Sequence, residues 1–122
     1  MKIINYIIII LSINYIFSQK ILIPMDQDQS DHLKAYGIAF WSLENGDPLN
    51  WLLNYRGGSF LMNSKESIQK ECLLRGITYY TVDGSQVNNI YKTIEENNME
   101  IVLLEKSPKI AVYSPPEKQP WD

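Results

Sequence analysis

The sequence has few of the side chains that most often form cross-links or carry out covalent chemistry. It contains one cysteine, Cys72, and one histidine, His32, among 122 residues. A disulfide framework needs an even set of cysteines, so the fold must be held together by its core. A cysteine nucleophile needs a partner base, and nothing in the sequence places His32 beside Cys72. Ile68 lies four residues before Cys72, on the same side of an expected helix, so we predict a buried, structural cysteine.

Positive charge is not in excess either. The chain carries 11 lysines and arginines against 14 aspartates and glutamates, which gives a formal net charge of −3. A mildly acidic chain lacks the basic surface that binds nucleic acid. It also lacks the polybasic cluster that anionic lipids attract. We therefore expect no nucleic-acid partner, and no membrane partner once the N-terminal segment is removed. No residue pattern indicates a metal or another cofactor, and the sequence shows no internal repeat.

The N-terminus carries the clearest signal. A lone charge at Lys2 precedes an apolar run over residues 3–17, and the small residue Ser18 stands before a polar stretch. This order is typical of a secretory signal peptide over residues 1–18. We expect cleavage after Ser18 or Gln19 and export to the periplasm or the extracellular space. An uncleaved anchor is the alternative, but a spanning helix needs roughly 20 mostly apolar residues, and this run is shorter and interrupted by polar side chains.

The remaining chain is long enough for one small domain and too short for two. Strands are expected where apolar, β-branched or aromatic residues run together, over 20–25, 51–55, 59–62, 77–82, 99–104 and 109–113. Helices are expected where apolar residues recur every three or four positions, over 32–45, 64–75 and around 87–94. A Gly-Gly pair between two strand patterns indicates a β-hairpin. The predicted fold is α/β or α+β, with a small mixed sheet and about three helices.

Several helix ends are marked by short-range signals. Ser30 or Asp31 can cap the first helix, and Gly46 stands where a left-handed residue ends it. Residues 63–66, Asn-Ser-Lys-Glu, match a capping box for the second helix. Residues 83–85, Asp-Gly-Ser, form a turn and a cap for the third.

The C-terminal residues suggest a continuation. The strand expected over 109–113 is followed by nine polar, proline-rich residues, 114–122. In open α/β sheets, a loop after a strand usually leads to a helix. We therefore expect an N-terminal α/β module over 19–106 and the start of a truncated following domain over 107–122. The alternative is a solvated tail after the last strand.

Four runs together resemble a known group of proteins. They are Gln-Lys-Ile-Leu-Ile-Pro-Met-Asp at 19–26, His-Leu-Lys-Ala-Tyr-Gly at 32–37, Trp-Leu-Leu-Asn-Tyr-Arg-Gly-Gly-Ser-Phe at 51–60 and Pro-Lys-Ile-Ala-Val-Tyr-Ser-Pro at 108–115. They resemble the N-terminal region of exported bacterial proteins commonly labelled asparagine synthetase B. The resemblance covers nearly all of the chain after the signal peptide. It implies a polypeptide several times longer, with an amidotransferase-like Rossmannoid domain after residue 114.

The resemblance brings no catalytic residue with it. True glutamine-dependent asparagine synthetases expose a cysteine directly after the initiator methionine, whereas this chain has Lys2 inside a signal peptide. They also carry a Ser-Gly-Gly-x-Asp-Ser pyrophosphate loop. The Gly-Gly pair here, Gly57-Gly58, lacks the trailing Asp-Ser. An exported synthetase would also lack its substrate ATP, which is scarce outside the cytoplasm.

One segment is a candidate anion site. Gly57 and Gly58 could expose backbone amides, and Arg56 and Ser59 could add side-chain donors. A phosphate loop should join a strand to a helix, whereas this segment joins two strands, so the alternative is an ordinary hairpin turn.

Two further groups of residues are candidates for a cation site and for a binding face. Asp26, Asp28, Asp31 and His32 form an oxygen-rich patch, but the patch lacks the glycine and terminal glutamate of a calcium loop, which leaves a solvated loop with a cap as the alternative. Six aromatic side chains could line a sugar- or peptide-binding face, although aromatic residues in a small domain usually form the core: Trp41, Trp51, Tyr55, Phe60, Tyr79 and Tyr80.

The favoured function is a non-catalytic N-terminal module that acts as a scaffold or recognition surface for the following domain of the same polypeptide. The first alternative is part of an amidotransferase-like enzyme or hydrolase whose active site lies in the missing C-terminal region. In that case residues 114–121 should approach residues 56–59. The second alternative is a free-standing binding protein, which would need a formed pocket.

Overall fold

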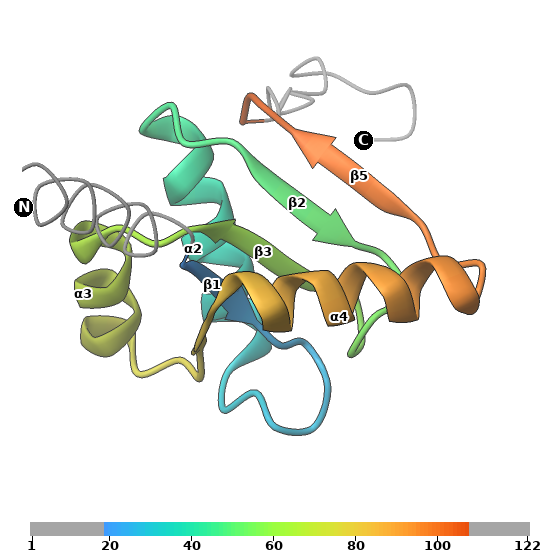
Figure 1. Cartoon of the computed structure of the whole chain (residues 1–122). Coiled ribbons are helices and arrows are strands. Elements are labelled where there is room, and N and C mark those ends of the chain that lie inside the picture. The colour runs from blue at the N-terminus through green and yellow to red at the C-terminus, as the bar shows by residue number, and fades with distance from the viewer. Residues whose placement is uncertain (1–18, 108–122) are drawn as a thin grey trace, which may run out of the picture.

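A computed structural model describes residues 19–107 of the chain. The expected signal peptide, the expected strand over 109–113 and the loop over 114–121 lie outside the described residues. The elements run in the order β1 (Lys20–Ile23), α2 (His32–Glu44), β2 (Leu49–Leu52), β3 (Ser59–Asn63), α3 (Glu66–Arg75), β4 (Tyr80–Val82), α4 (Gly84–Glu96) and β5 (Ile101–Leu104) (Figure 1). Three helices and one sheet over the described part confirm the predicted class, as an α+β fold with hairpins.

The sheet is antiparallel throughout, so the prediction of a mixed sheet was wrong. Its strand order is β4-β1-β3-β2-β5, and each of the four pairings is antiparallel. The reason is that every helix joins two strands of like direction that are not neighbours. β3 lies between β1 and β2, and β1 lies between β3 and β4. The first four strands with α2 and α3 thus form the split βαβ arrangement of ferredoxin-like folds.

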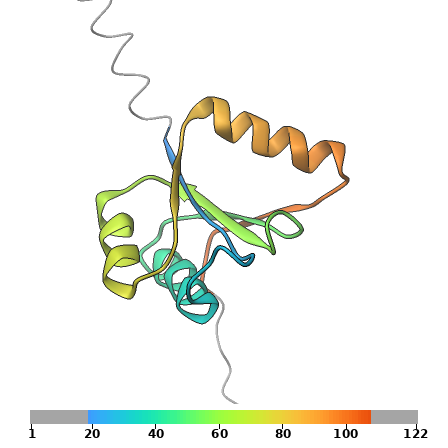
Figure 2. The ribbon, with the colours of Figure 1, turned by 90° about the horizontal axis from the view of Figure 1, so that it is seen from below.

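Each face of the sheet contributes to a separate core, because successive strand side chains point to opposite sides. One face, called the α2 face here, packs against α2 and α3 with a core that includes Ile21, Ile23, Ala35, Ile38, Phe60, Met62, Ile68 and Cys72. The opposite face, called the α4 face, is packed by Leu22, Leu52, Leu61, Val82, Val87, Ile90 and Ile94. Figure 2 shows the resulting layers, with α2 and α3 on one side of the sheet and α4 on the other.

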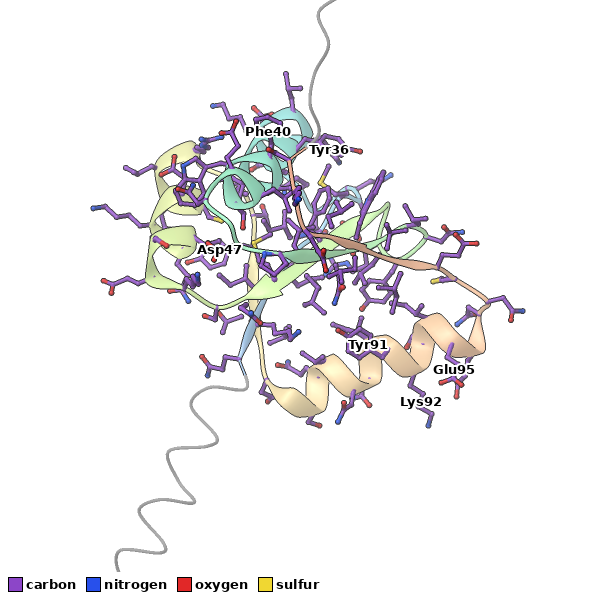
Figure 3. All side chains as sticks on the ribbon, turned by 90° about the horizontal axis from the view of Figure 1, so that it is seen from above. Tyr36, Phe40, Asp47, Tyr91, Lys92 and Glu95 are labelled. Carbon is purple, nitrogen blue, oxygen red and sulfur yellow. The ribbon has the colours of Figure 1, made fainter. Side chains whose placement is uncertain are left out.

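Helix α4 connects the two outermost strands of the sheet. Four strand spacings separate β4 from β5, which is about 19 Å, and a helix of 13 residues is about 20 Å long. One side of α4 buries Val87, Ile90 and Ile94 against the sheet. Tyr91 also points toward the sheet, whereas Lys92 points away from it (Figure 3). A single amphipathic helix therefore covers the α4 face diagonally and leaves part of it open beside β4.

The helix caps agree with the sequence patterns except at α3. Asp31 caps α2 by accepting a bond from the backbone N–H of Lys34, and Gly46 has a positive φ. The capping box expected over 63–66 was wrong: α3 begins after Lys65, which makes no side-chain cap. Asn63 cannot cap because it remains in β3, opposite Lys20. A capping box forms instead at α4, between Asp83 and Gln86.

Four of the expected strands are shorter in the structure, and in β2 and β4 the reason is that loops take up the backbone groups. β2 ends at Leu52 rather than at residue 55, and the carbonyl of Tyr55 accepts bonds from the N–H groups of Gly58 and Ser59. β4 begins at Tyr80 rather than at residue 77. Both backbone groups of Thr78 are bonded to the side chain of Gln29 and are not free to extend the ladder.

Cys72 is fully buried, which confirms the prediction. Burial raises the pKa of its thiol to about 11. The protonated thiol is therefore the stable form at neutral pH, and Cys72 acts as a core residue.

Candidate functional site

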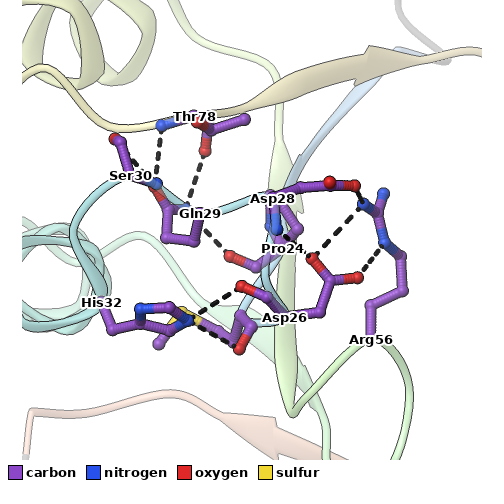
Figure 4. A network of polar contacts seen from close by, with 9 residues as sticks. Pro24, Asp26, Asp28, Gln29, Ser30, His32, Arg56 and Thr78 are labelled. Carbon is purple, nitrogen blue, oxygen red and sulfur yellow. Dashed lines mark hydrogen bonds and ion pairs between the residues drawn. The ribbon is translucent and has the colours of Figure 1, made fainter.

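The loop after β1 and the hairpin loop between β2 and β3 meet at Arg56. The Nε of Arg56 donates to Oδ2 of Asp26 over 2.8 Å, and its Nη2 donates to the carboxylate of Asp28 (Figure 4). The backbone N–H of Met25 donates to the carbonyl of Arg56 over 3.0 Å. Side-chain and backbone bonds therefore join two loops that lie about thirty residues apart in the sequence.

The hairpin loop contacts the loop after β1 through residues with positive φ. Arg56, Gly57 and Gly58 have φ values of 47°, 79° and 92°. An added Cβ on Gly57 would lie 2.4 Å from the carbonyl oxygen of Met25. Only glycine fits at position 57, because any side chain would meet the backbone of the neighbouring loop.

The charges around Arg56 bear on the predicted anion site. One guanidinium faces two carboxylates, those of Asp26 and Asp28, so the group has a net negative charge. The hydrogen bond from Arg56 lowers the pKa of Asp26, and the same bond raises the pKa of Arg56. The hydroxyl of Ser59 is buried and donates to the carbonyl of Tyr55 over 2.8 Å. Anion binding at residues 56–59 stays a prediction, and the local charge argues against it.

Gln29 organises the same loop and was not singled out by the sequence. It is 5% exposed, and its Nε2 donates to the carbonyls of Pro24 and Thr78 over 2.8 and 2.9 Å. Its Oε1 accepts from the backbone N–H of Thr78 over 2.8 Å (Figure 4). A polar residue in a polar loop gives no sequence signal of burial, because its partners come from a distant segment.

The oxygen-rich patch over 26–32 is not assembled into a cation site. Asp26 and Asp28 bind Arg56, and Asp31 caps α2. The Nε2 of His32 lies 3.0 Å from the carbonyl oxygen of Met25, which it can bind only as a donor. Over residues 19–107, no group of three or more acidic, histidine or cysteine side chains could hold a metal ion.

The aromatic residues do not form one face. Phe60 is buried, and Trp51 packs against it in a stacked arrangement with ring centroids 6.0 Å apart, on the α2 face. Tyr55 packs on the α4 face instead. Tyr80, 40% exposed, lies beneath the guanidinium of Arg56, with 5.2 Å from the guanidinium carbon to the ring centroid. Most of these residues therefore support the core, and four of them border hollows: Trp51 and Phe60 on the α2 face, and Tyr55 and Tyr80 on the α4 face.

The first hollow is a polar cleft on the α4 face. It has a volume of about 380 Å³ and lies between α4, β4 and the hairpin loop. Leu22, Val82 and Ile90 form its floor, and tyrosines stand at its rim. Because α4 crosses the sheet diagonally, this part of the face beside β4 is left uncovered.

The second hollow is an apolar groove on the α2 face. It has a volume of about 440 Å³ and is lined almost wholly by apolar side chains: Leu33, Tyr36, Gly37, Ala39, Phe40, Leu43, Trp51, Phe60 and Leu104. Leu33 is 81% exposed and Tyr36 48% exposed. Tyr36 and Phe40 lie on α2, on the side of the sheet away from α4 (Figure 3), and the ring of Tyr36 lies edge-on to that of Phe60 with centroids 5.8 Å apart. No residue in this lining carries a charge.

Comparison with known proteins gives no relative: the chain matches no family model, no curated protein and no solved structure. The likeness to the exported proteins labelled asparagine synthetase B therefore stays a prediction from the four sequence runs. In the described part of the chain, no helix combines the length and the apolar character needed to cross a membrane.

Proposed function

We propose that this chain is a non-catalytic N-terminal module of a larger exported bacterial protein. Its role is to present the apolar groove on the α2 face as a docking surface for the part of the polypeptide that follows. The observation that supports this role most directly is the groove itself. Large exposed apolar patches on soluble proteins usually mark interaction sites, and this groove brings together aromatic and aliphatic side chains without a charged residue.

The position of β5 favours the same polypeptide as the occupant. Leu104, the last residue of β5, lines the groove. Any residues that follow β5 therefore start beside the groove. A tethered segment docks at a high effective concentration, so a modest apolar contact is enough to hold it.

A non-catalytic role also agrees with the chemistry of the described residues. The thiol of Cys72 is buried with a raised pKa, so it cannot serve as an exposed nucleophile. The Nε2 of His32 lies against backbone carbonyls, which ties this side of the ring to the loop after β1. If the complete protein is an enzyme, we expect its catalytic residues to come from the following part.

The first test is to read the genomic DNA directly after codon 122. An open frame of several hundred codons is the expected result, and an immediate stop codon would refute the larger-protein proposal. The second test uses the complete protein with Leu33→Arg in the groove. Its control is Leu74→Arg on α3, where the leucine is similarly exposed, at 72%, and does not line the groove.

We expect Leu33→Arg to lower the melting temperature of the complete protein and to increase proteolysis at the junction after β5. Leu74→Arg should leave both unchanged, because surface substitutions usually change stability by less than about 0.5 kcal/mol. Equal effects of the two variants would show that the groove is not the docking surface.

A further inference from the structure

We propose that the polar cleft between α4 and β4 binds a neutral saccharide unit. The cleft lies on the α4 face, opposite the docking groove, so this proposal does not depend on the proposed docking function. Its volume of about 380 Å³ falls within the range of roughly 300–1,000 Å³ that is usual for small-molecule sites. The cleft combines an apolar floor with polar walls, as such sites do.

Helix α4 supplies a row of uncharged hydrogen-bonding side chains along one wall. Gln86, Asn89 and Thr93 all line the cleft, and their spacing of three and four residues places them on one stripe of the helix. Amide and hydroxyl groups can both donate and accept hydrogen bonds. They therefore suit the hydroxyl groups of a sugar, which also do both.

Two of these side chains are already oriented by the fold. The Oε1 of Gln86 accepts from the backbone N–H of Asp83 over 2.9 Å, within the capping box, which leaves its Nε2 as the donor. The hydroxyl of Thr93 donates to the carbonyl of Asn89 over 2.9 Å, which leaves its oxygen as an acceptor. A ligand thus meets groups whose orientation costs little further entropy to fix.

The opposite wall is aromatic. Tyr55 comes from the hairpin loop and Tyr80 from β4, and both line the cleft. Arg56 stacks on the ring of Tyr80 at 5.2 Å and is itself held by Asp26. This contact holds the ring of Tyr80, and both tyrosines bring aromatic surface and phenolic hydroxyls to the cleft. An apolar surface opposite a row of amides matches a sugar ring, which has C–H faces and a polar edge.

The charges of the cleft favour a neutral ligand. Arg56 is the one charged residue in the lining of the cleft. Its charge is offset by ion pairs with Asp26 and Asp28, which do not line the cleft. An anion would meet a group with net negative charge, and a cation would find no carboxylate within the lining. Neither sign of charge is favoured over an uncharged polyol.

The test is a two-dimensional amide NMR titration of the complete chain with cellobiose, maltose and N,N′-diacetylchitobiose, and with galacturonate as an anionic probe. The matched variants are Asn89→Leu, at an exposed α4 position that lines the cleft, and Asn88→Leu, at the adjacent exposed position that does not. We expect saturable shifts around the cleft for at least one neutral disaccharide. Losing one hydrogen bond in Asn89→Leu should weaken binding about three- to tenfold, and Asn88→Leu should bind like the unchanged chain.

Three outcomes would overturn the proposal. The first is no saturable shift with any neutral disaccharide at millimolar concentration. The second is equal weakening by Asn88→Leu and Asn89→Leu, which would place the sugar elsewhere. The third is tighter binding of galacturonate than of the neutral probes, which would instead support an anion site at Arg56. Both leucine variants replace exposed residues, so we expect both proteins to fold.

Discussion

Replacing Gly57 by alanine tests whether the hairpin loop must contact the loop after β1. Gly57 has a φ of 79°, and an added Cβ would lie 2.4 Å from the oxygen and 2.7 Å from the carbon of the Met25 carbonyl. These are backbone atoms, and the N–H of Met25 is bonded to the carbonyl of Arg56. They cannot move aside as a flexible side chain would, so the two loops would have to separate.

The expected loss of stability has two parts. A positive φ costs an alanine roughly 1–2 kcal/mol, and forcing extra volume into a packed site typically costs about 1–3 kcal/mol. Gly57→Ala should therefore lower the free energy of unfolding by about 2–5 kcal/mol. Small domains have only about 5–15 kcal/mol in total, so the variant should unfold at a clearly lower urea concentration.

Gly46→Ala is the matched control. Gly46 has the same φ of 79°, and an added Cβ would meet no atom within 4 Å. It should show the conformational cost alone, about 1–2 kcal/mol. The measurement is the urea midpoint and slope of both variants by circular dichroism. If Gly57→Ala loses no more stability than Gly46→Ala, the close contact between the loops is not structurally important and the reasoning is refuted.

Two further predictions concern buried groups. Because burial raises the pKa of Cys72 to about 11 from about 8.5 in an unfolded chain, the folded state keeps the thiol proton longer. The free energy of unfolding should therefore be highest below about pH 8.5 and fall as pH rises toward 11. Urea unfolding repeated across that range should show a smaller fall for Cys72→Ala. An equal fall in both proteins would contradict the raised pKa of Cys72. Gln29→Leu leaves three backbone groups of Pro24 and Thr78 without their side-chain partner and should cost about 2–4 kcal/mol. Gln69→Leu, which loses a single bond to Ser64, should cost about 1 kcal/mol or less by the same assay, and equal losses would refute a special role for Gln29.

Local patterns in the sequence were enough to predict the elements. The apolar residues Val87, Ile90 and Ile94 recur at helical spacing, and they are the residues that α4 buries. Residues 21–23 form a continuous apolar run, and β1 is buried on both faces as an inner strand of the sheet. Asp31 caps α2 as a short polar residue at a helix start should. Each of these signals depends on neighbours within one or two turns of the chain.

Features that depend on distant partners could not be predicted in this way. The pairing of Arg56 with Asp26 spans thirty positions, and that of Gln29 with Thr78 spans forty-nine. The order of the strands likewise follows from how the helices cross the sheet, so the antiparallel pattern was missed. The aromatic residues show the same limit: their types suggested one binding face, but Trp51 in β2 packs on the α2 face, whereas Tyr55 in the loop after β2 packs on the α4 face.

The groove and the cleft lie on opposite faces of the sheet, so docking and ligand binding can be tested separately. β1 supplies Leu22 to the α4 face, and Ile21 and Ile23 to the α2 face, so this strand is part of both cores. Helices α2 and α4, in contrast, each line one of these two hollows. Leu33 on α2 lines the groove and not the cleft, and Asn89 on α4 lines the cleft and not the groove. A protein with both Leu33→Arg and Asn89→Leu should therefore show the two single effects added together, because distant sites without shared partners are usually independent. Coupling between them would mean that docking on one face changes ligand binding on the other through the sheet.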